Sequence, residues 1–490
     1  MNSTLEKEHL KASLLIDGEP REASSARTFE RINPFNGELA SVSAAATIED
    51  AKAAVASAQA AFPAWSAMGP HSRRKILLKA ADLLEAKTPD FVSINMAETG
   101  ATAPWIGFNV SVGAKMLREA ASMTTQISGE VIPAEKPGVI SMGVRQAAGV
   151  CLGIAPWNAA VILGVRAIAL PLACGNTVVL KASEMCPKTH QMIGEVLMES
   201  GIPEGVVNVI TNDPKDAPAI VQTLIQEPAV KRVNFTGSTK VGKIIAKLCA
   251  EELKPCLLEL GGKAPFIVLD DADLEGAVNG AIFGAYMNMG QICMSTERII
   301  VTEGIADKFV AAFAAKASKL PAGDPAGPNV LGALVTHQAA EKLDGLIEDA
   351  LARGAKLAAG GDRNGAVVPA SVLDGVTPAM RIYSEESFGP VKSIIRVKDA
   401  EEAIRVANDT EYGLSASLYT SDVKKGLDYA KRIQSGICHI NGPTVADEPQ
   451  MPFGGVKASG YGRFGGKAGI EEFTELRWIT IEDPKQGYPF

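Results

Sequence analysis

One cysteine occupies a position from which it could act as a nucleophile. Cys293 lies three residues after Gly290 in FGAYMNMGQICMSTER, where a helical pattern ends before the apolar run RIIVTE. A thiol on such an irregular connection can face a cleft, and its thiolate is a strong nucleophile. A single cysteine is, however, more often a small buried apolar residue. The spacing therefore leaves a nucleophile and a core residue as alternatives for Cys293.

Two polar residues at the ends of apolar runs could assist a nucleophile. Glu259 ends the run CLLE shortly before two glycines. A carboxylate at that position is either a salt-bridged strand end or a base with a raised pKa. Asn158 follows Pro156 and Trp157, where the run CLGIA stops. It could cap a helix, or it could present its amide at the sheet edge where α/β folds bind ligands.

A third segment has the composition of a phosphate-binding turn. FTGSTKVGKII places Gly237, Ser238 and Gly242 between an apolar run and a helical pattern. Backbone amides at the N-terminus of a helix can bind a phosphate. Because the spacing is not GxGxxG, the segment alone is a weak signal for a dinucleotide.

These residues fall in two series of alternating strands and helices. The first series contains the runs CLGIAP, TVVLKAS, GVVNVIT, KRVNFTG and CLLELGG, and the second contains APFIVL, RIIVTE, VKSIIRV and SGICHI. The alternation predicts two α/β domains with parallel sheets, joined near 261–262, where a cleft is expected. Upstream, 47–65 and 72–91 show helical spacing, and Thr47 with Asp50 resembles a capping box. These helices are predicted to cover the first domain.

Composition excludes several classes of function. The 490 residues carry a net charge of -8 without a basic run, which argues against a nucleic-acid-binding protein. The N-terminal segment lacks the apolar core of a signal peptide, and no apolar run reaches the ~18 residues of a membrane span. The seven cysteines and five histidines form no metal-ligand spacing. We therefore expect a cytoplasmic protein with free thiols, no membrane contact and no metal.

Taken together, the segments resemble the aldehyde dehydrogenase superfamily. Its members carry the motifs PWN, K-x-x-E, FTGS, LELGGK, GQ-x-C and E-x-FGPV, which this chain has in the same order at 156–158, 181–184, 235–238, 258–263, 290–293 and 386–391. The stretch 155–187 is also similar to the branch that oxidises salicylaldehyde, vanillin and hydroxybenzaldehydes. The resemblance covers nearly the whole chain, including MPFGGVKASGYGR near its end.

The resemblance implies an arrangement of domains. It places an NAD-binding domain at 1–124 and 148–261, and a catalytic domain at 262–469. Both are expected to be Rossmann-like α/β domains with parallel sheets. A small β oligomerisation element is expected at 125–147 and 470–490, built from a hairpin and a C-terminal strand. A homo-oligomer, either a dimer or a tetramer, follows from this element.

The resemblance also implies catalytic roles for three residues. Cys293 would attack the aldehyde to form a thiohemiacetal, whose oxyanion accepts hydrogen bonds from Asn158 and from the backbone N–H of Cys293. Hydride would then pass to the nicotinamide and leave a thioester. Glu259 would activate the water that hydrolyses the thioester. Because relatives that transfer the acyl group to coenzyme A typically lack this glutamate, a free carboxylate is the expected product.

For the cofactor, the resemblance implies NAD. Lys181 and Glu184 match positions that reach the adenine ribose, and a carboxylate there would repel a 2′-phosphate, although Lys181 could offset the repulsion. Trp157 and Ser238 match contacts to the pyrophosphate, Glu386 a contact to the nicotinamide ribose, and Phe388 the packing around the nicotinamide. The residues expected to bind the cofactor are Trp157, Lys181, Glu184, Gly237, Ser238, Gly242, Glu386 and Phe388.

The expected substrate is an aromatic aldehyde, with an aliphatic aldehyde or a semialdehyde as the alternative. The residues expected to line its funnel are mostly apolar, and the small Ala159 among them would admit a flat ring. They are Trp105, Ala159, Ile162, Arg166, Met287, Ile292, Met294 and Phe453. Arg166 is the exception in this set. It is either part of an ion pair on the surface or at a subunit contact, or a ligand for a ring hydroxyl or the product carboxylate.

Two residue patterns disfavour other classes of function. An inactive structural protein on the same fold would normally have lost Cys293 or Glu259, and both are present. An NAD-independent cysteine esterase would need a histidine base, and no histidine lies in the matching motifs. The sequence therefore favours the dehydrogenase.

Overall fold

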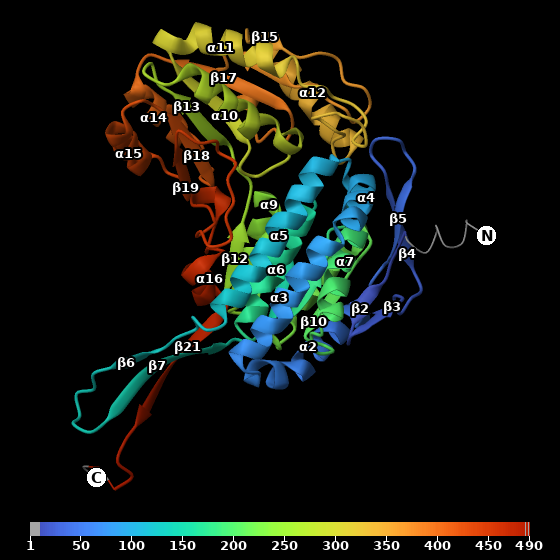
Figure 1. Ribbon diagram of the computed structural model, residues 1–490, viewed down its shortest axis with the longest axis vertical. Helices are drawn as coiled ribbons and strands as arrows, with labels where there is room; N and C mark the ends of the chain where they lie inside the picture. Colours follow the sequence, from blue (N-terminus) through green and yellow to red (C-terminus); the bar gives the residue numbers. More distant parts are fainter. Residues whose placement is uncertain (1–9, 486, 489) are drawn as a thin grey trace.

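The computed structural model describes residues 10–485, 487, 488 and 490, so predictions on residues 1–9, 486 and 489 lie outside the described residues. Two large sheets form the upper and lower parts of the molecule in Figure 1, and a narrow three-stranded sheet projects from the lower part. None of the helices in this described part of the chain is both long and apolar enough to cross a membrane.

The lower sheet contains all five strands of the first predicted series. The strands that pair in parallel are, in spatial order, β12 (Cys256–Glu259), β11 (Val230–Thr236), β8 (Val150–Ile154), β9 (Thr177–Lys181) and β10 (Val207–Ile210). The sequence did not predict the antiparallel strands at the edges, which are β20 (Gly460–Tyr461), β2 (Leu14–Ile16) and β3 (Glu19–Arg21).

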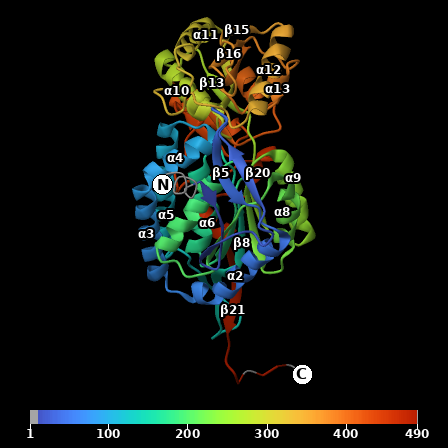
Figure 2. The ribbon, with the colours of Figure 1, turned by 90° about the vertical axis from the view of Figure 1, so that its right-hand side faces the viewer.

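Helices cover both faces of the lower sheet, as its central parallel strands, which carry apolar side chains on both faces, require. In β9, Val178 and Leu180 pack in one apolar cluster and Val179 in another, because successive side chains of a strand point to opposite faces. Figure 2 shows the two helical layers. One layer contains α3 (Pro70–Ala86), α4 (Thr88–Thr99), α5 (Ala103–Met123), α6 (Ala160–Ala173) and α7 (Pro187–Glu199), and the other contains α2 (Ile48–Ala67), α8 (Ala217–Gln226) and α9 (Thr239–Glu251).

The predicted N-terminal helices are present, with one difference. Thr47 and Asp50 form the expected capping box at the start of α2. The segment 72–91, predicted as a single helical stretch, is instead divided between α3 and α4 at Lys87. Pro89 explains the break, because proline has no N–H to donate and its ring clashes with the carbonyl four residues earlier, so α3 cannot continue through it.

The upper sheet contains the second predicted series. Its parallel strands are, in spatial order, β16 (Ser371–Asp374), β17 (Val391–Val397), β14 (Thr296–Thr302), β13 (Ala264–Val268), β18 (Ser415–Tyr419) and β19 (Ile437–Ile440), with β15 (Lys356–Ala359) antiparallel at the edge. Its helices are α10 (Leu274–Tyr286), α11 (Glu303–Ala317), α12 (His337–Ala352), α13 (Arg381–Ser384), α14 (Ala400–Asn408) and α15 (Val423–Arg432).

The projecting sheet confirms the predicted hairpin and C-terminal strand. It consists of β6 (Glu130–Ile132), β7 (Ile140–Ala147) and β21 (Thr474–Ile481), and we call these three strands the arm. β21 pairs with β7 along its whole length, from Thr474 opposite Ala147 to Ile481 opposite Ile140. Beside β21 lies α16 (Gly466–Glu472), and a second small sheet contains β1 (Lys11–Ala12), β5 (Leu39–Ala44) and β4 (Thr28–Ile32). The predicted α/β architecture with a small β element is therefore confirmed.

Candidate active site

The parallel order of three strands brings distant segments to one edge of the lower sheet. β12, β11 and β8 are neighbours, so their carboxyl ends meet there. Glu259 ends β12, Gly237 follows β11, and Asn158 lies four residues beyond the end of β8. This is the edge at which open α/β sheets bind ligands. The structure therefore brings together three segments that the sequence analysis had singled out separately.

Two pockets meet at Cys293 and Asn158, which line both of them. The first, which we call the apolar pocket, also contains Trp105, Phe108, Ala159, Ile162, Leu163, Arg166, Phe283, Met287, Ile292, Met294, Val445, Ala446, Asp447 and Phe453. The second, which we call the polar pocket, also contains Pro156, Trp157, Thr236, Gly237, Ser238, Glu259, Gly261, Glu386 and Phe388. A substrate in one pocket could thus place its reacting carbon at the thiol, next to a second molecule bound in the other pocket.

Cys293 lies on an irregular connection, as predicted. The chain leaves α10 through a short turn, Met287–Gly290, and enters β14 only at Thr296. Asn288, Met289 and Gly290 all have positive φ, at 48°, 55° and 72°. At Gly290 a Cβ atom would lie 2.4 Å from the backbone oxygen of Gly389, so only glycine fits. This turn ends the helix and leaves the Cys293 thiol half-buried at the junction of the two pockets.

The side chain of Asn158 is held against the loop that carries Cys293. Its Nδ2 donates to the backbone oxygen of Gln291 at 3.0 Å. Its own backbone oxygen accepts from Trp105 Nε1 at 3.1 Å and from Asn288 Nδ2 at 2.8 Å. The alternative that Asn158 caps a helix is wrong, because α6 begins at Ala160 with Ala159 at its N-cap and no side-chain cap. Since an amide nitrogen carries two hydrogens, one remains for an oxygen at the reacting carbon.

Glu259 does not form the salt bridge that was one of its two interpretations. It is fully buried, and neither carboxylate oxygen has a hydrogen-bond partner among the described residues. Burial raises the pKa of Glu259 to about 7, and the neighbouring Cys293 thiol and the positive charge of Arg166 offset only part of that rise. A group with this pKa can both accept and release a proton near neutral pH.

The thiol of Cys293 needs a base. Burial and the negative charge of Glu259 raise its pKa well above the ordinary value, while the Arg166 guanidinium lowers it to a smaller extent. The thiol is therefore protonated at neutral pH in this arrangement. No histidine lines either pocket within the described part of the chain, so Glu259 is the residue placed to take this proton.

The polar pocket has features that fit a dinucleotide. Ser238 caps α9 by accepting from the Val241 N–H at 3.4 Å, so the first amides of that helix lie at the edge of the pocket. Phe388 has a positive φ of 51°, and its ring meets that of Trp157 edge-on with 5.8 Å between the centroids. Glu386 accepts from the Gly262 N–H at 2.9 Å, and burial raises its pKa to about 7.

Comparison with known proteins decides the family. The model of the aldehyde dehydrogenase family matches residues 21–479. The chain belongs to the aldehyde dehydrogenase family. It is 60% identical over 481 residues to a vanillin dehydrogenase from Pseudomonas fluorescens. The aligned region covers 98% of this chain and 100% of the relative. The resemblance inferred from the motifs is thereby confirmed.

Solved structures agree with this assignment. A crystal structure of a salicylaldehyde dehydrogenase from Pseudomonas putida G7, complexed with salicylaldehyde, superposes with a TM-score of 0.97 at 50% identity, covering 98% of this chain and 100% of that one. A crystal structure of PnpE in complex with nicotinamide adenine dinucleotide superposes with a TM-score of 0.93 at 36% identity, covering 98% and 99% of the two chains.

In this aldehyde dehydrogenase, five of the eight residues expected at the cofactor line the polar pocket. They are Trp157, Gly237, Ser238, Glu386 and Phe388. Gly242 lies inside α9, donates its N–H to Ser238 and leaves room for Leu260. Lys181 and Glu184 form an ion pair at the end of β9, outside that lining, and Glu184 also accepts from Asn212 Nδ2 at 3.1 Å.

All eight residues expected to line the substrate funnel lie in the apolar pocket. Six further lining residues were missed, namely Phe108, Leu163, Phe283, Val445, Ala446 and Asp447. Helical spacing could have indicated two of these. Phe108 stands three residues after Trp105 in α5, and Leu163 stands four after Ala159. Val445, Ala446 and Asp447 lie on a loop without such a periodic signal.

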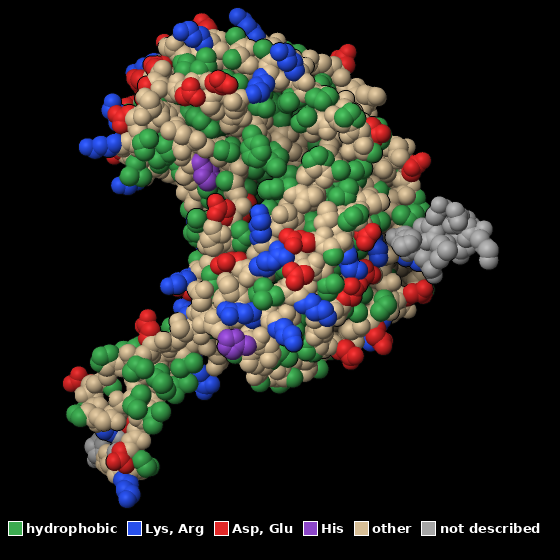
Figure 3. Space-filling model, in the orientation of Figure 1, with side chains coloured by type: hydrophobic (Ala, Val, Ile, Leu, Met, Phe, Trp, Pro, Cys, Tyr) green, Lys and Arg blue, Asp and Glu red, His purple; other side chains and the backbone are tan. Residues whose placement is uncertain are grey.

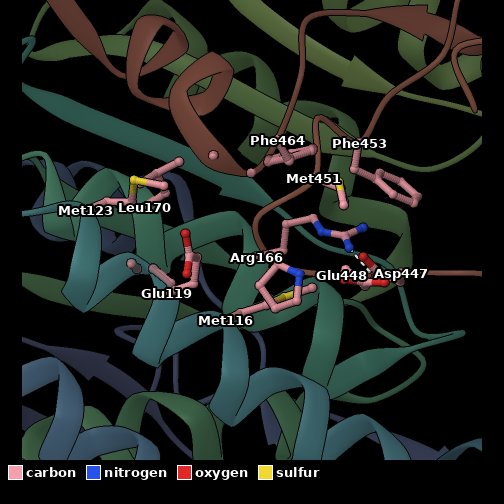
Figure 4. A pocket seen from close by; sticks show the side chains of 15 residues that line it. Met116, Glu119, Met123, Arg166, Leu170, Asp447, Glu448, Met451, Phe453 and Phe464 are labelled. Atoms are coloured by element: carbon pink, nitrogen blue, oxygen red, sulfur yellow. Dashed lines mark hydrogen bonds and ion pairs between the residues drawn. The ribbon is translucent and has the colours of Figure 1, made fainter. Parts of the chain in front are cut away.

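Arg166 is in the funnel, and it also forms an ion pair. Its side chain is buried and pairs with Asp447, and its guanidinium lies 4.2 Å from the centroid of the Phe453 ring. Figure 4 shows the guanidinium between Asp447 and Phe453. The ion pair is therefore not on the surface, which was one of the interpretations of Arg166, because the Arg166 side chain is only 6% exposed and that of Asp447 10%.

Proposed function

We propose that this aldehyde dehydrogenase oxidises an aromatic aldehyde to the carboxylate, with NAD as the hydride acceptor. The observation that carries the proposal is the position of Cys293 at the junction of the two pockets. The rings of Trp105, Phe108, Phe283 and Phe453 line the apolar pocket, and flat apolar walls favour a flat aromatic substrate. The names of the similar vanillin and salicylaldehyde dehydrogenases support the same class.

The first part of the mechanism forms a bond between Cys293 and the aldehyde. Glu259 takes the thiol proton, and the sulfur attacks the aldehyde carbon. The carbonyl oxygen becomes an oxyanion that accepts from the free N–H of Asn158 and from the backbone N–H of Cys293. Because Asn158 is already held by the Gln291 oxygen, it needs no reorientation at this step.

The second part oxidises the carbon and releases the product. NAD, when bound, supplies the acceptor for the hydride that leaves the tetrahedral carbon. The carbon remains attached to Cys293 as a thioester. Glu259 releases the thiol proton to solvent before this step and then takes a proton from water as the hydroxide attacks the thioester. The thiolate of Cys293 leaves and takes its proton back from Glu259, and the carboxylic acid product ionises. Aldehyde, NAD and water are thus converted to carboxylate, NADH and two protons.

The residues of the polar pocket fit this cofactor. The amides at the start of α9 suit a pyrophosphate, and Phe388 with Trp157 forms an aromatic wall near Cys293. Glu184 lies three residues beyond the end of β9, where a carboxylate disfavours a 2′-phosphate. Its pairing with Lys181 reduces this repulsion, so the preference for NAD over NADP is expected to be moderate.

We assign residues 1–124 and 148–261, which contain most of the lower sheet, to an NAD-binding domain. We assign residues 262–469 to a catalytic domain. β20 is an exception, because it lies in the second range but pairs with β12 of the lower sheet. The oligomerisation element, 125–147 with 470–490, contains the arm and would join subunits into a dimer or tetramer. A reducing compartment such as the cytoplasm suits an enzyme whose seven cysteines are all free thiols.

A panel of aldehydes tests the proposed function. The purified protein is mixed with hydroxylated benzaldehydes, benzaldehyde and short aliphatic aldehydes, each with NAD and with NADP, and NADH or NADPH is followed by absorbance. We expect a higher kcat/KM for the aromatic aldehydes with NAD, and no turnover in Cys293→Ala. Equal or better use of short aliphatic aldehydes would overturn the aromatic assignment.

A further inference from the structure

The two carboxylate oxygens of Asp447 have different surroundings. Oδ2 is paired with the Arg166 guanidinium. Oδ1 is buried and has no hydrogen-bond partner among the described residues. The side chain as a whole is only 10% exposed. A buried acceptor without a donor costs free energy, so Oδ1 is a site at which a donor would be bound favourably.

Asp447 lies in the same pocket as the nucleophile. Apart from Asn158 and Cys293 at the reacting end, the polar side chains that line this pocket are those of Arg166 and Asp447. The other lining residues are apolar, and four of them are aromatic. A flat substrate with its aldehyde at Cys293 would therefore have its ring against apolar walls, and a second polar group on that ring would meet Arg166 and Asp447.

We propose that Oδ1 of Asp447 is the acceptor that selects substrates with a ring hydroxyl. This inference rests on the proposed oxidation of aromatic aldehydes and specifies the substrates within that class. An ionised carboxylate only accepts hydrogen bonds, so it favours a group that donates one. A phenolic hydroxyl donates, whereas a methoxy group and a substrate carboxylate do not. A carboxylate would in addition be repelled by the charge of Asp447.

Arg166 then has a different role from the one expected of it. Its charge is already opposed by Asp447, and its guanidinium is stacked on Phe453. These contacts fix Arg166, and Arg166 in turn fixes the plane of the Asp447 carboxylate. Arg166 is therefore a positioning residue for Asp447, while Asp447 is the residue that contacts the substrate hydroxyl.

A second cavity provides the competing explanation. Arg166, Asp447 and Phe453 also line a second cavity, together with Glu448, Met451 and Phe464, as Figure 4 shows. Water entering from this cavity could donate to Oδ1. In that case the Asp447 carboxylate would be satisfied without substrate and would not discriminate between ring substituents.

Matched pairs of substrates separate these explanations. The 2-, 3- and 4-hydroxybenzaldehydes are compared with the methoxybenzaldehydes substituted at the same ring position, using kcat/KM with NAD. A hydrogen bond to a charged group corresponds to a preference of about tenfold or more. We expect the wild type to show this preference for the hydroxyl compound at one or more ring positions. A ratio near one at every position would overturn the proposal.

Substitutions test whether Asp447 causes the preference. Asp447→Leu removes the acceptor and should bring the hydroxyl-to-methoxy ratio close to one, while kcat/KM for benzaldehyde changes much less. Asp447→Asn keeps the shape with a weaker, neutral acceptor, so the ratio should fall but remain above one. Glu448→Leu is the matched control, because this neighbouring carboxylate lines the second cavity and is not among the described residues that line the apolar pocket. It should leave the ratio unchanged.

The outcomes distinguish this inference from the proposed function. An unchanged hydroxyl-to-methoxy ratio in Asp447→Asn overturns the role of Asp447. This test remains available if Asp447→Leu fails to fold. The proposed function fails separately, if the wild type does not oxidise benzaldehyde with NAD. Activity toward benzaldehyde with no effect of Asp447 on the ratio would leave the dehydrogenase intact and assign Oδ1 to water.

Discussion

Burial disfavours the charged forms of both Cys293 and Glu259, so neither group ionises at its ordinary pKa. The thiol stays protonated until another group takes its proton, and the carboxylate has a pKa of about 7. A base with this pKa can accept a proton and release it again within one turnover. At the residue scale, one carboxylate can therefore serve both the attack by sulfur and the hydrolysis of the thioester.

The first prediction concerns pH. The rate of thioester hydrolysis is expected to rise with pH and to level off above a pH of about 7, because only the ionised form of Glu259 accepts a proton from water. It is measured as the release of acyl enzyme in a single turnover at each pH. Burial also raises the pKa of Glu386 to about 7, so Glu386→Gln is the control. The inflection should persist in Glu386→Gln and disappear in Glu259→Gln, and its persistence in the latter would contradict the assignment.

The second prediction concerns the stability provided by the buried pair of Arg166 and Asp447. Arg166→Met leaves the Asp447 charge buried without its partner, which should lower the free energy of unfolding by about 3–5 kcal/mol. The double variant Arg166→Met with Asp447→Leu removes both charges and should lose much less. Denaturant unfolding of the two variants and the wild type gives the comparison. Equal losses in the single and double variants would show that the pair is not coupled.

At the scale of elements, the turn between α10 and β14 determines where the thiol lies. Three consecutive residues with positive φ reverse the chain, and two of them, Asn288 and Met289, are not glycine. Such conformations are unfavourable for side chains and persist only where the surroundings hold them. Here Asn288 donates to the Asn158 oxygen, which links the turn to the lower sheet.

The third prediction tests this turn. Gly290→Ala introduces a Cβ 2.4 Å from the Gly389 oxygen at a φ of 72°, so the loop must move. We expect kcat/KM to fall by at least about tenfold, because a shift of the nucleophile by about 1 Å is costly. Gly107→Ala, where a Cβ meets nothing within 4 Å, is the control and should retain activity. Full activity of Gly290→Ala would show that the turn tolerates other geometries.

The elements also show what the sequence could predict. β8, β9, β10, β11 and β12 were predictable because each is a short segment rich in β-branched or apolar residues, and most of their residues are buried. β20 was not, since two residues pair with a strand about two hundred positions earlier, and no local pattern encodes that pairing. The break at Lys87 was missed because the apolar periodicity of 72–91 outweighed the single Pro89 signal.

The residues of the active site were likewise predictable only in part. Cys293, Glu259 and Asn158 were found because they interrupt or end apolar runs, and the motifs then connected them. The choice between interpretations required the structure, since a sequence cannot show that Glu259 is buried without a hydrogen-bond partner among the described residues. No sequence pattern indicated Asp447, because it lies on a loop and its ion pair with Arg166 is visible only in the structure.

At the scale of the whole molecule, the arm carries several exposed apolar side chains. Leu476 is 63% exposed, Trp478 77% and Val131 76%. Figure 3 shows hydrophobic side chains over this projecting part. An isolated three-stranded sheet with exposed apolar side chains is unfavourable in water and indicates a binding surface. We expect a second copy of the chain to cover it.

The fourth prediction follows from the arm. The wild type should have the mass of a dimer or a tetramer in solution, and Leu476→Glu combined with Val131→Glu should shift it toward the monomer, because buried unpaired charges oppose association. Light scattering after size exclusion measures the mass. Leu253→Glu is the control, since Leu253 is 91% exposed and lies outside the arm. An unchanged oligomer in the arm variant would place the subunit contact elsewhere.

The most direct test of the account is to trap the thioester. Glu259→Gln is mixed with a hydroxybenzaldehyde and NAD, quenched, and analysed by peptide mass spectrometry while NADH is followed. The expected result is a burst of about one NADH per active site, acylation of the Cys293 peptide, and steady turnover slowed by about 10²–10⁴-fold. NADH formation without acylation of Cys293, or acylation of another of the seven cysteines, would contradict the account.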